Sequence, residues 1–324
     1  MRFVRPALVT AAAALATACV TYEPLSDFYA GPEQLPESVA ERYDYAVTEA
    51  LSDDIELSRR RPRFTAHEVV LPASDEGEPI VLEYYEHAQS DGPKPVVMVL
   101  PIYDGQPIVT RYFARYFAQR GWAAVAVAVD RDRLRRMDGI EQAIRDTLVD
   151  YRRVLDWIES NPALDHEHIG VFGMSFGGID AVMLAALDDR VGALVVGMAG
   201  GDLPYIAANT RYRPVHRAID EMLEESGQSR LAFERSLDAA IVTDPLLLAP
   251  YVDAERVLLV LARTDAIVPF DSQQELRLSL GNPEALYLPT GHRTSIVFFP
   301  KLRSSAYEFF ARQFAAEGAA GVPN

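Results

Sequence analysis

The sequence predicts an α/β fold: a mostly parallel central sheet, helices on both of its faces, and a helical insertion before the penultimate strand. Two observations lead to this prediction. Short apolar segments alternate with longer segments in which apolar residues recur every three or four positions. Residues 96–100 and 257–261 are apolar throughout, as strands are when helices cover both faces of a sheet. The 324 residues, 49% of them apolar, are enough to bury the core of such a fold.

The order of the elements follows from local pattern. Residues 67–72 and 80–86 predict an antiparallel hairpin, because two short strands flank a polar turn. The longest predicted helix, residues 140–158, carries an apolar stripe that needs a sheet to pack against. The alternating elements are expected, in chain order, as strand 96–100, helix 108–119, strand 123–129, helix 140–158, strand 169–173, helix 177–187, strand 193–196, strand 257–261, helix 272–280, strand 285–288 and a closing helix near 301–314.

One segment, residues 202–254, interrupts this alternation between two strands. It is too long for a simple connector and contains helical stretches at 215–225 and 229–237. Ligands bind at the carboxyl edge of open α/β sheets, so we interpret the segment as a cap over that edge. Five of its side chains either shape an acyl pocket or form the packing core of the cap: Tyr205, Tyr212, His216, Met222 and Phe233.

The N-terminus has the features of an export signal. Arg2 and Arg5 precede 12 small, mostly apolar residues, 7–18, a run too short for a bilayer that needs ~20 residues. The single cysteine, Cys19, follows directly. Residues 15–19 resemble the lipobox of bacterial lipoproteins, in which this cysteine becomes the lipidated first residue, although the usual leucine is displaced by one position. The same junction also fits the A-x-A cleavage site of an ordinary secreted protein, which would leave a free thiol.

These features predict the division of the chain. We expect a signal peptide (residues 1–18), a tether and N-terminal extension (19–64), the α/β domain (65–316) with its cap, and a C-terminal tail (317–324). Residues 36–57 within the extension could be helical but lack a clean apolar face. Lipidation at Cys19 would place the exported protein in the bacterial cell envelope. Val20 replaces the aspartate that retains lipoproteins in the inner membrane, which favours the outer membrane.

The charge balance excludes one class of partner. The formal charge is −16, and it becomes −18 when Arg2 and Arg5 are removed with the signal. Such a surface repels phosphate backbones, so no nucleic-acid partner is expected. The local exception is the arginine-rich run at residues 59–63, which is either a solvated linker or a contact for anionic lipid or sugar.

A G-x-S-x-G motif at residues 173–177 indicates a nucleophile. It directly follows a predicted strand and directly precedes a predicted helix, which is the context that the motif requires. Ser175 would then lie on a sharp turn at a helix N-terminus, where the dipole and the free N–H groups favour developing negative charge. We therefore predict that Ser175 is a nucleophile.

A serine hydroxyl needs a base, and the base needs an orienting group. Of the six histidines, His292 follows the last predicted strand, at the same carboxyl edge as Ser175. Asp265 leaves that edge after the preceding strand and is the first candidate acid. Asp202 and Asp271 remain alternatives.

These residues resemble the α/β-hydrolase superfamily, whose nucleophile, acid and histidine follow one another in this chain order. The resemblance covers about residues 67–314 and points to serine hydrolases of the esterase or dienelactone-hydrolase kind. It implies an α/β-hydrolase fold with Ser175 as nucleophile, Asp265 as acid and His292 as base. The family also carries a cap where residues 202–254 stand.

Acyl transfer also needs donors for an oxyanion. The N–H of Phe176, directly after the nucleophile, is one candidate. The second would come from the loop after strand 96–100, through the N–H of Ile102 or Tyr103 or through the Tyr103 hydroxyl. Because this loop lacks the family's common HGGG pattern, the second donor stays open, and Tyr103 could instead be a rim aromatic.

No cofactor or metal is predicted. Residues 165–168, which contain two histidines, precede a strand at the edge opposite Ser175, and no H-E-x-x-H motif occurs. The glycine patterns of nucleotide-binding loops are also missing from the sequence. A single cysteine cannot form a disulfide framework or a zinc site of several cysteines.

The motifs together predict a serine hydrolase that cleaves carboxylic esters through an acyl-enzyme. Its partners would be a small-molecule or peptide acyl substrate and, through the lipid anchor, a membrane. Two alternatives remain. The unusual oxyanion loop would also suit a serine peptidase or amidase related to prolyl oligopeptidase, and the fold can persist in a lipid-anchored binding protein without activity.

Overall fold

The computed structural model describes residues 20–46, 54–72, 79–88, 92–103, 107–128 and 139–320. Its strands are β1 (Thr21–Glu23), β2 (Asp54–Arg60), β3 (Phe64–Leu71), β4 (Ile80–His87), β5 (Lys94–Val99), β6 (Ala123–Ala128), β7 (Leu164–Met174), β8 (Ala193–Gly197), β9 (Val257–Ala262) and β10 (Glu284–Leu288). Its helices are α2 (Glu37–Ala40), α3 (Pro107–Ala118), α4 (Ile140–Ser160), α5 (Phe176–Leu187), α6 (Leu203–Asn209), α7 (Arg213–Ser226), α8 (Arg230–Ala240), α9 (Pro245–Leu248), α10 (Phe270–Ser279) and α11 (Phe299–Ala320). Short 3₁₀ turns are η1 (Glu41–Tyr43), η3 (Ala249–Tyr251), η4 (Ala254–Arg256) and η5 (Arg293–Phe298).

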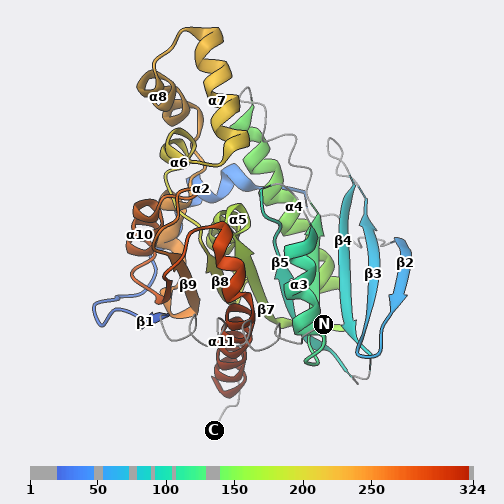
Figure 1. Ribbon diagram of the computed structural model, residues 1–324. Helices are drawn as coiled ribbons and strands as arrows, with labels where there is room; N and C mark the ends of the chain where they lie inside the picture. Colours follow the sequence, from blue (N-terminus) through green and yellow to red (C-terminus); the bar gives the residue numbers. More distant parts are fainter. Residues whose placement is uncertain are drawn as a thin grey trace, which may run out of the picture.

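All the strands among the described residues belong to one 10-stranded sheet with the order β1-β10-β9-β8-β7-β5-β6-β4-β3-β2 (Figure 1). Strands β5 to β10 pair in parallel, while β1 at one end and β4, β3 and β2 at the other pair antiparallel. The predicted hairpin is β3–β4. Because the six central strands are parallel, their carboxyl ends meet at one edge of the sheet.

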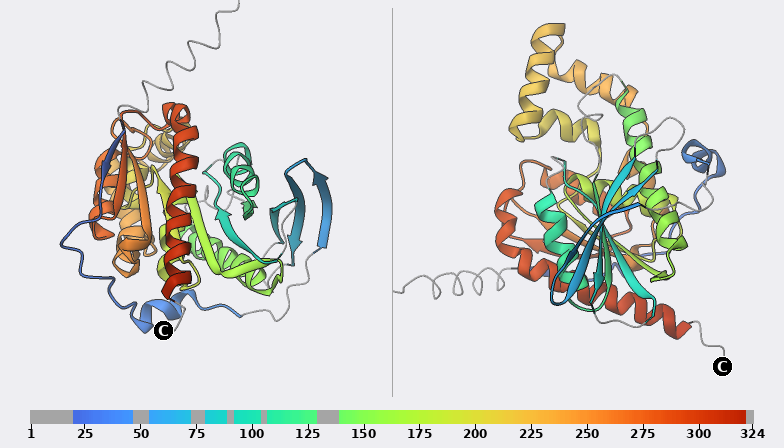
Figure 2. Two further views of the ribbon diagram at one scale, coloured as in Figure 1. Left: turned by 90° about the horizontal axis from the view of Figure 1, so that it is seen from below. Right: turned by 90° about the vertical axis from the view of Figure 1, so that its right-hand side faces the viewer.

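Helices cover both faces of the sheet, as predicted. Alternate residues of β5 face opposite ways: Val96 and Met98 join the cluster beneath α4, α5 and α10, whereas Val97 and Val99 join the cluster beneath α3 and α11. The turned views in Figure 2 show these layers and the cap helices beyond the sheet. The central strands are therefore buried on both faces, which explains their uninterrupted apolar sequence.

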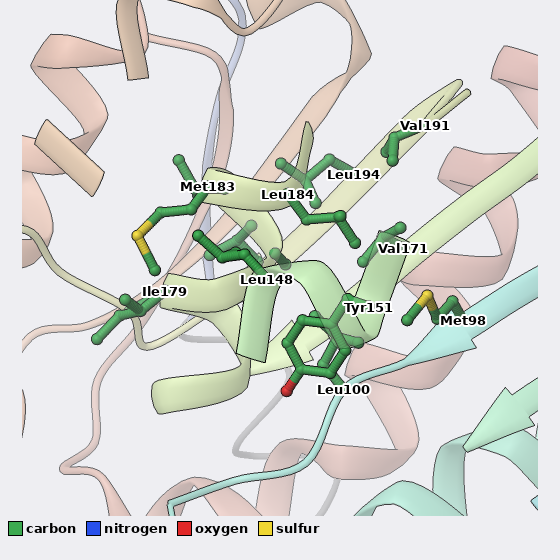
Figure 3. Close-up of a cluster of buried hydrophobic side chains, with 14 of the residues drawn as sticks. Met98, Leu100, Leu148, Tyr151, Val171, Ile179, Met183, Leu184, Val191 and Leu194 are labelled. Atoms are coloured by element: carbon green, nitrogen blue, oxygen red, sulfur yellow. The ribbon is translucent and has the colours of Figure 1, made fainter. Parts of the chain in front are cut away.

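The packing of α4 and α5 on the sheet holds the nucleophile region in place. Leu148 and Tyr151 of the predicted α4 stripe are completely buried, and they pack among Met98, Val171 and Met183 (Figure 3). The Tyr151 hydroxyl also donates a hydrogen bond of 3.0 Å to the buried carboxylate of Asp180 in α5. Helix α5 is thus fixed by both apolar packing and a buried polar contact.

The expected cap is present as helices α6 to α9 between β8 and β9, and its helices α6, α7 and α8 project beyond the carboxyl edge of the sheet (Figure 1). Asp244 accepts hydrogen bonds from the N–H groups of Asp202 (3.1 Å) and Leu203 (2.6 Å), so it joins the two stems of the cap. Burial raises the pKa of Asp244. Glu141 of α4 accepts from the N–H (2.9 Å) and hydroxyl (2.8 Å) of Thr243 and anchors the second stem to the body. Burial alone would raise the pKa of Glu141, but the hydrogen bonds from Thr243 outweigh it and lower this pKa.

The N-terminal extension differs from our expectation. Within the segment expected to be tether and extension, β1 pairs with β10 and β2 pairs with β3, so both strands belong to the sheet. Among the described residues between 36 and 57, helical structure occurs in α2 and η1. Edge strands are half-solvated and depend on a distant partner, so their own sequence carries little apolar alternation. The arginine-rich run at residues 59–63 is exposed at the end of β2 and in the turn to β3, rather than in a linker.

Candidate active site

Ser175 lies on a strained turn between β7 and α5. Its backbone has φ 54° and ψ −127°, a conformation that residues other than glycine seldom adopt. Two backbone hydrogen bonds hold the turn: the Ser175 N–H donates to the Gly197 carbonyl at 2.7 Å, and the Ser175 carbonyl accepts from Gly178 at 2.9 Å. Ser175 therefore stands at the helix N-terminus, as the strand–turn–helix context predicts.

The two glycines of the motif are required by close approach of the backbone. A Cβ atom on Gly173 would lie 2.1 Å from the carbonyl oxygen of Gly177. A Cβ atom on Gly177 would lie 2.7 Å from the carbonyl oxygen of Pro101, in the loop after β5. The turn can therefore be this tight only with glycine at both places, and the loop after β5 runs against the start of α5.

The structure brings Asp265 and His292 together. The loop after β9 carries Asp265 and the loop after β10 carries His292, and a hydrogen bond of 2.6 Å joins His292 Nδ1 to Asp265 Oδ2. The two loops also run side by side, because the Thr264 N–H donates to the Thr290 carbonyl at 3.1 Å. Since the carboxylate accepts from Nδ1–H, Nε2 of His292 holds the lone pair that a base requires. The Asp265 side chain is fully buried, and that of His292 is 15% exposed.

The alternative acids have other partners. The Asp202 carboxylate accepts from the N–H of Tyr205 at 3.0 Å and caps α6. The Asp271 carboxylate accepts from the Tyr205 hydroxyl at 2.6 Å, and this hydrogen bond raises the pKa of Tyr205 to about 12. Neither arrangement involves His292, so the contacts favour Asp265 as the acid.

Gln273 of α10 is a positioning residue that sequence analysis did not identify. Its amide nitrogen donates to Asp265 Oδ2 (3.1 Å) and to the Val268 carbonyl (2.8 Å), and its amide oxygen accepts from the Ala262 N–H (3.0 Å). The N–H groups of Ile267 and Val268 donate to Asp265 Oδ1. The carboxylate is thus oriented by four donors, including His292. In the sequence, the one feature that indicates this role is position: Gln273 lies one turn into the helix that follows the loop of Asp265.

We expect Gln273→Ala to lower kcat for ester hydrolysis on the order of tenfold with little change in KM, because Asp265 and with it His292 lose part of their orientation. The matched control is Gln274→Ala, whose side chain is exposed on the same helix. Steady-state kinetics of both variants decide the point. Equal kcat in the two variants, or a change in KM alone, would contradict the positioning role.

The predicted oxyanion residues lie on two adjoining segments. Phe176 is the first residue of α5, and the Tyr103 ring packs edge-on against the Phe176 ring, with centroids 5.8 Å apart. Tyr103 also contacts the ring of Tyr212 in the cap at 5.9 Å. The Ile102 side chain packs instead against the apolar cluster beneath α3 and α11. Tyr103 is therefore the predicted residue of this loop whose side chain faces Phe176 and the cap.

A cavity of about 450 Å³ opens beside Ser175, between the sheet and the cap. Ser175, Phe176 and Tyr103 line it, together with residues from α4 and from cap helices α6, α7 and α8. Of the five cap side chains singled out from the sequence, Tyr212, Met222 and Phe233 line the cavity. Tyr205 bonds to Asp271, and His216 pairs with Asp220 Oδ2 at 2.7 Å on the cap surface.

The histidine-rich segment 165–168 lies at the opposite edge of the sheet, in the first half of β7, where His168 Nδ1 pairs with Asp165 Oδ2 at 2.7 Å. Within the described ranges, no three His, Cys, Asp or Glu side chains gather as metal ligands would. No helix among the described residues combines the length and apolarity of a membrane crossing. Cys19, the predicted lipidation site, and residues 1–18 lie outside the described residues.

Solved structures share this architecture, which is that of the α/β-hydrolases. An acetyl xylan esterase from Paenibacillus sp. R4 has a TM-score of 0.59 at 18% identity, over 86% of this chain and 99% of that one. Acetyl xylan esterase 1 from Thermoanaerobacterium sp. JW/SL YS485 has a TM-score of 0.57 at 16% identity, over 86% and 96%. A cold-adapted esterase from an Arctic intertidal metagenomic library has a TM-score of 0.52 at 18% identity, over 79% and 99%. The predicted fold is thereby confirmed.

The sequence profile of the family described as "Esterase FrsA-like" matches residues 48–246, and the chain belongs to this family. Two uncharacterized proteins of Mycobacterium tuberculosis, from two strains, are each 27% identical over 171 residues, or 52% of this chain. The match covers 37% of the length of each of these relatives. The family and the fold are thus those of esterase-type hydrolases.

Proposed function

We propose that this protein is a serine hydrolase that cleaves carboxylic esters through an acyl-enzyme, with Ser175 as nucleophile, His292 as base and Asp265 as the acid that orients it. The observation that carries the proposal is the 2.6 Å hydrogen bond from His292 to a fully buried Asp265, in loops that leave the same sheet edge as the strained turn of Ser175. An aspartate held by three further donors orients an imidazole more rigidly than a solvated one would.

In the acylation half-reaction, Ser175 Oγ attacks the ester carbonyl carbon while His292 Nε2 takes the hydroxyl proton. The carbonyl π electrons move to oxygen and form a tetrahedral oxyanion, which the Phe176 N–H at the start of α5 stabilises. The carbon–oxygen bond to the alcohol then breaks, and His292 returns the proton to the departing oxygen. Asp265 stays ionised throughout and stabilises the imidazolium that forms.

Deacylation repeats these steps with water as the nucleophile. His292 removes a proton from water, the resulting hydroxide attacks the acyl carbon, and Ser175 Oγ leaves with the proton from His292. The second oxyanion donor in the proposal comes from the loop at Ile102 and Tyr103. The close approach of this loop to the motif supports the assignment, since a Cβ atom on Gly177 would lie 2.7 Å from the carbonyl oxygen of Pro101.

A fluorophosphonate probe tests the proposal on the signal-free protein. We expect a phosphonyl adduct on Ser175, located by peptide mass spectrometry, and its loss in His292→Ala because the hydroxyl is no longer activated. His216→Ala is the matched control, since this histidine lies on the cap surface and pairs with Asp220. Absence of labelling in folded protein would support the binding-protein alternative. Faster turnover of anilides than of matched esters would support the peptidase alternative.

We also propose that the exported protein is anchored through a lipid on Cys19, on the strength of the lipobox-like junction. We expect the intact protein in the membrane fraction of its bacterial host and Cys19→Ser in the soluble fraction, because the thiol that carries the lipid is gone. Fractionation and immunoblotting of both forms measure this. A wild-type protein that is already soluble would contradict the anchor, without bearing on the hydrolase proposal.

A further inference from the structure

We propose that the cavity under the cap binds the acyl half of the substrate, and that the preferred substrates are esters of apolar acids with medium-length chains. This inference rests on the proposed function, because it assigns substrate chemistry to the site at Ser175. It is carried by the lining of the cavity, by its volume and by the side of Ser175 on which it lies.

The lining is apolar almost throughout. Sixteen of the twenty described residues that line the cavity are apolar, and none of the twenty is charged. The exceptions are Ser175, Thr210, Tyr103 and Tyr212. The Thr210 hydroxyl donates to the Ile267 carbonyl at 2.7 Å and accepts from the Tyr212 N–H at 3.1 Å, so it is already paired. Among the described residues, the lining thus favours a hydrocarbon chain over a polar or charged acyl group.

The volume is too large to be a packing defect. Protein interiors contain few voids larger than a water molecule, and an apolar void costs the contacts that its lining lacks. A space of about 450 Å³ instead falls among ligand sites. At about 30 Å³ for each water-sized group, an octanoyl chain fills roughly half of it. An acetyl group would leave most of the apolar lining unused.

The position of the cavity indicates the acyl half rather than the alcohol. His292 has to protonate the departing oxygen, so the alcohol lies beside His292 when it leaves. The cavity is lined by Ser175 and Phe176 but not by His292. The chain that enters it is therefore attached to the carbonyl carbon that Ser175 holds. Helices α7 and α8 supply the far wall through Ile219, Met222 and Leu237.

Two series of esters test the inference on the signal-free protein. In the first, the alcohol is p-nitrophenol and the acyl group runs from acetyl to octanoyl; in the second, the acyl group is acetyl and the alcohol runs from methyl to octyl. Burial of one methylene corresponds to about a threefold to fourfold gain in kcat/KM. We expect octanoyl to exceed acetyl by at least about 100-fold. The alcohol series should change less than about tenfold. An acetyl optimum, or a chain-length gain confined to the alcohol series, would overturn the inference.

Variants of the wall provide a second measurement. Met222→Trp fills the cavity from α7, and we expect it to lower the octanoyl-to-acetyl ratio of kcat/KM at least tenfold while acetyl turnover stays within about threefold. The matched control is Leu231→Trp, since this leucine of α8 is 58% exposed and is not among the residues that line the cavity. An unchanged ratio in a folded Met222→Trp variant would also overturn the inference. If that variant does not fold, the wild-type ester series decides alone.

The failure of this inference can be told apart from failure of the hydrolase proposal. Hydrolysis of acetyl esters that requires Ser175, without any preference for longer acyl chains, would reject only the acyl cavity. No hydrolysis of any ester and no fluorophosphonate adduct on Ser175 would reject the hydrolase proposal and the inference with it.

Discussion

Ser175→Ala is expected to lower kcat for p-nitrophenyl ester hydrolysis by at least ~10³-fold, because no other hydroxyl stands on the turn between β7 and α5 to form the acyl-enzyme. The residual rate would come from binding and from the oxyanion donors, which the substitution does not remove. Steady-state kinetics at saturating ester measure the loss. KM should change much less than kcat, since the apolar cavity remains intact.

The fold of this variant should be retained. The hydrogen bonds that hold the turn use the Ser175 backbone N–H and carbonyl, and alanine supplies both groups. Thermal unfolding followed by circular dichroism is the control for folding. Turnover within tenfold of the wild type in a folded Ser175→Ala variant would end the proposed mechanism.

Asp265→Asn is expected to lower kcat by about 10³-fold to 10⁴-fold with little effect on KM. The asparagine amide can donate to His292 Nδ1, which then has to accept. The ring proton moves to Nε2, and the base is lost. The N–H groups of Ile267 and Val268 can still donate to the side-chain oxygen that replaces Asp265 Oδ1, so the acid loop keeps its shape.

Asp271→Asn is the matched control for this prediction. Asp271 is one of the two alternative acids, but its carboxylate accepts from Tyr205 and from the Ser272 N–H, at distances of 2.6 Å and 3.1 Å. We expect its kcat to stay within about threefold of the wild type, the range of an ordinary surface substitution. A large loss in Asp271→Asn together with an active Asp265→Asn would transfer the role of the acid to Asp271.

Local pattern was sufficient for the elements that can be recognised one segment at a time. The buried parallel strands are continuous apolar runs, and the stripe on α4 has the helical period, so both were predictable without knowledge of their neighbours. The motif at residues 173–177 was also predictable from its own segment. Its glycines are needed because backbone atoms of the turn itself approach them. The edge strands β1 and β2 were missed because their pairing partners, and not their own residues, make them strands.

The acid of the site illustrates what the sequence determines and what only the tertiary structure determines. Chain order placed three aspartates near one sheet edge and made Asp265 the first candidate, but it left Asp202 and Asp271 as alternatives. The hydrogen bond from His292 singles out Asp265, since the other two carboxylates bind Tyr205. Gln273 was not recognisable for the same reason. Its role depends on where α10 packs relative to the acid loop.

The cavity also could not be predicted from the pattern of apolar residues in the sequence. The sequence of a cap helix is the same whether its apolar residues fill a core or line a cavity. From the sequence alone, Met222 and Phe233 were therefore compatible with both arrangements, and the structure places them in the cavity lining. Periodicity reports which residues leave water, because solvation acts on each segment separately. Which buried surfaces then meet and which stay apart is set by contacts between distant segments. The nucleophile, the base and the first candidate acid were therefore predictable from the sequence. The contact that favours Asp265 over the other two aspartates, and the space beside the nucleophile, were decided by the packing of the whole molecule.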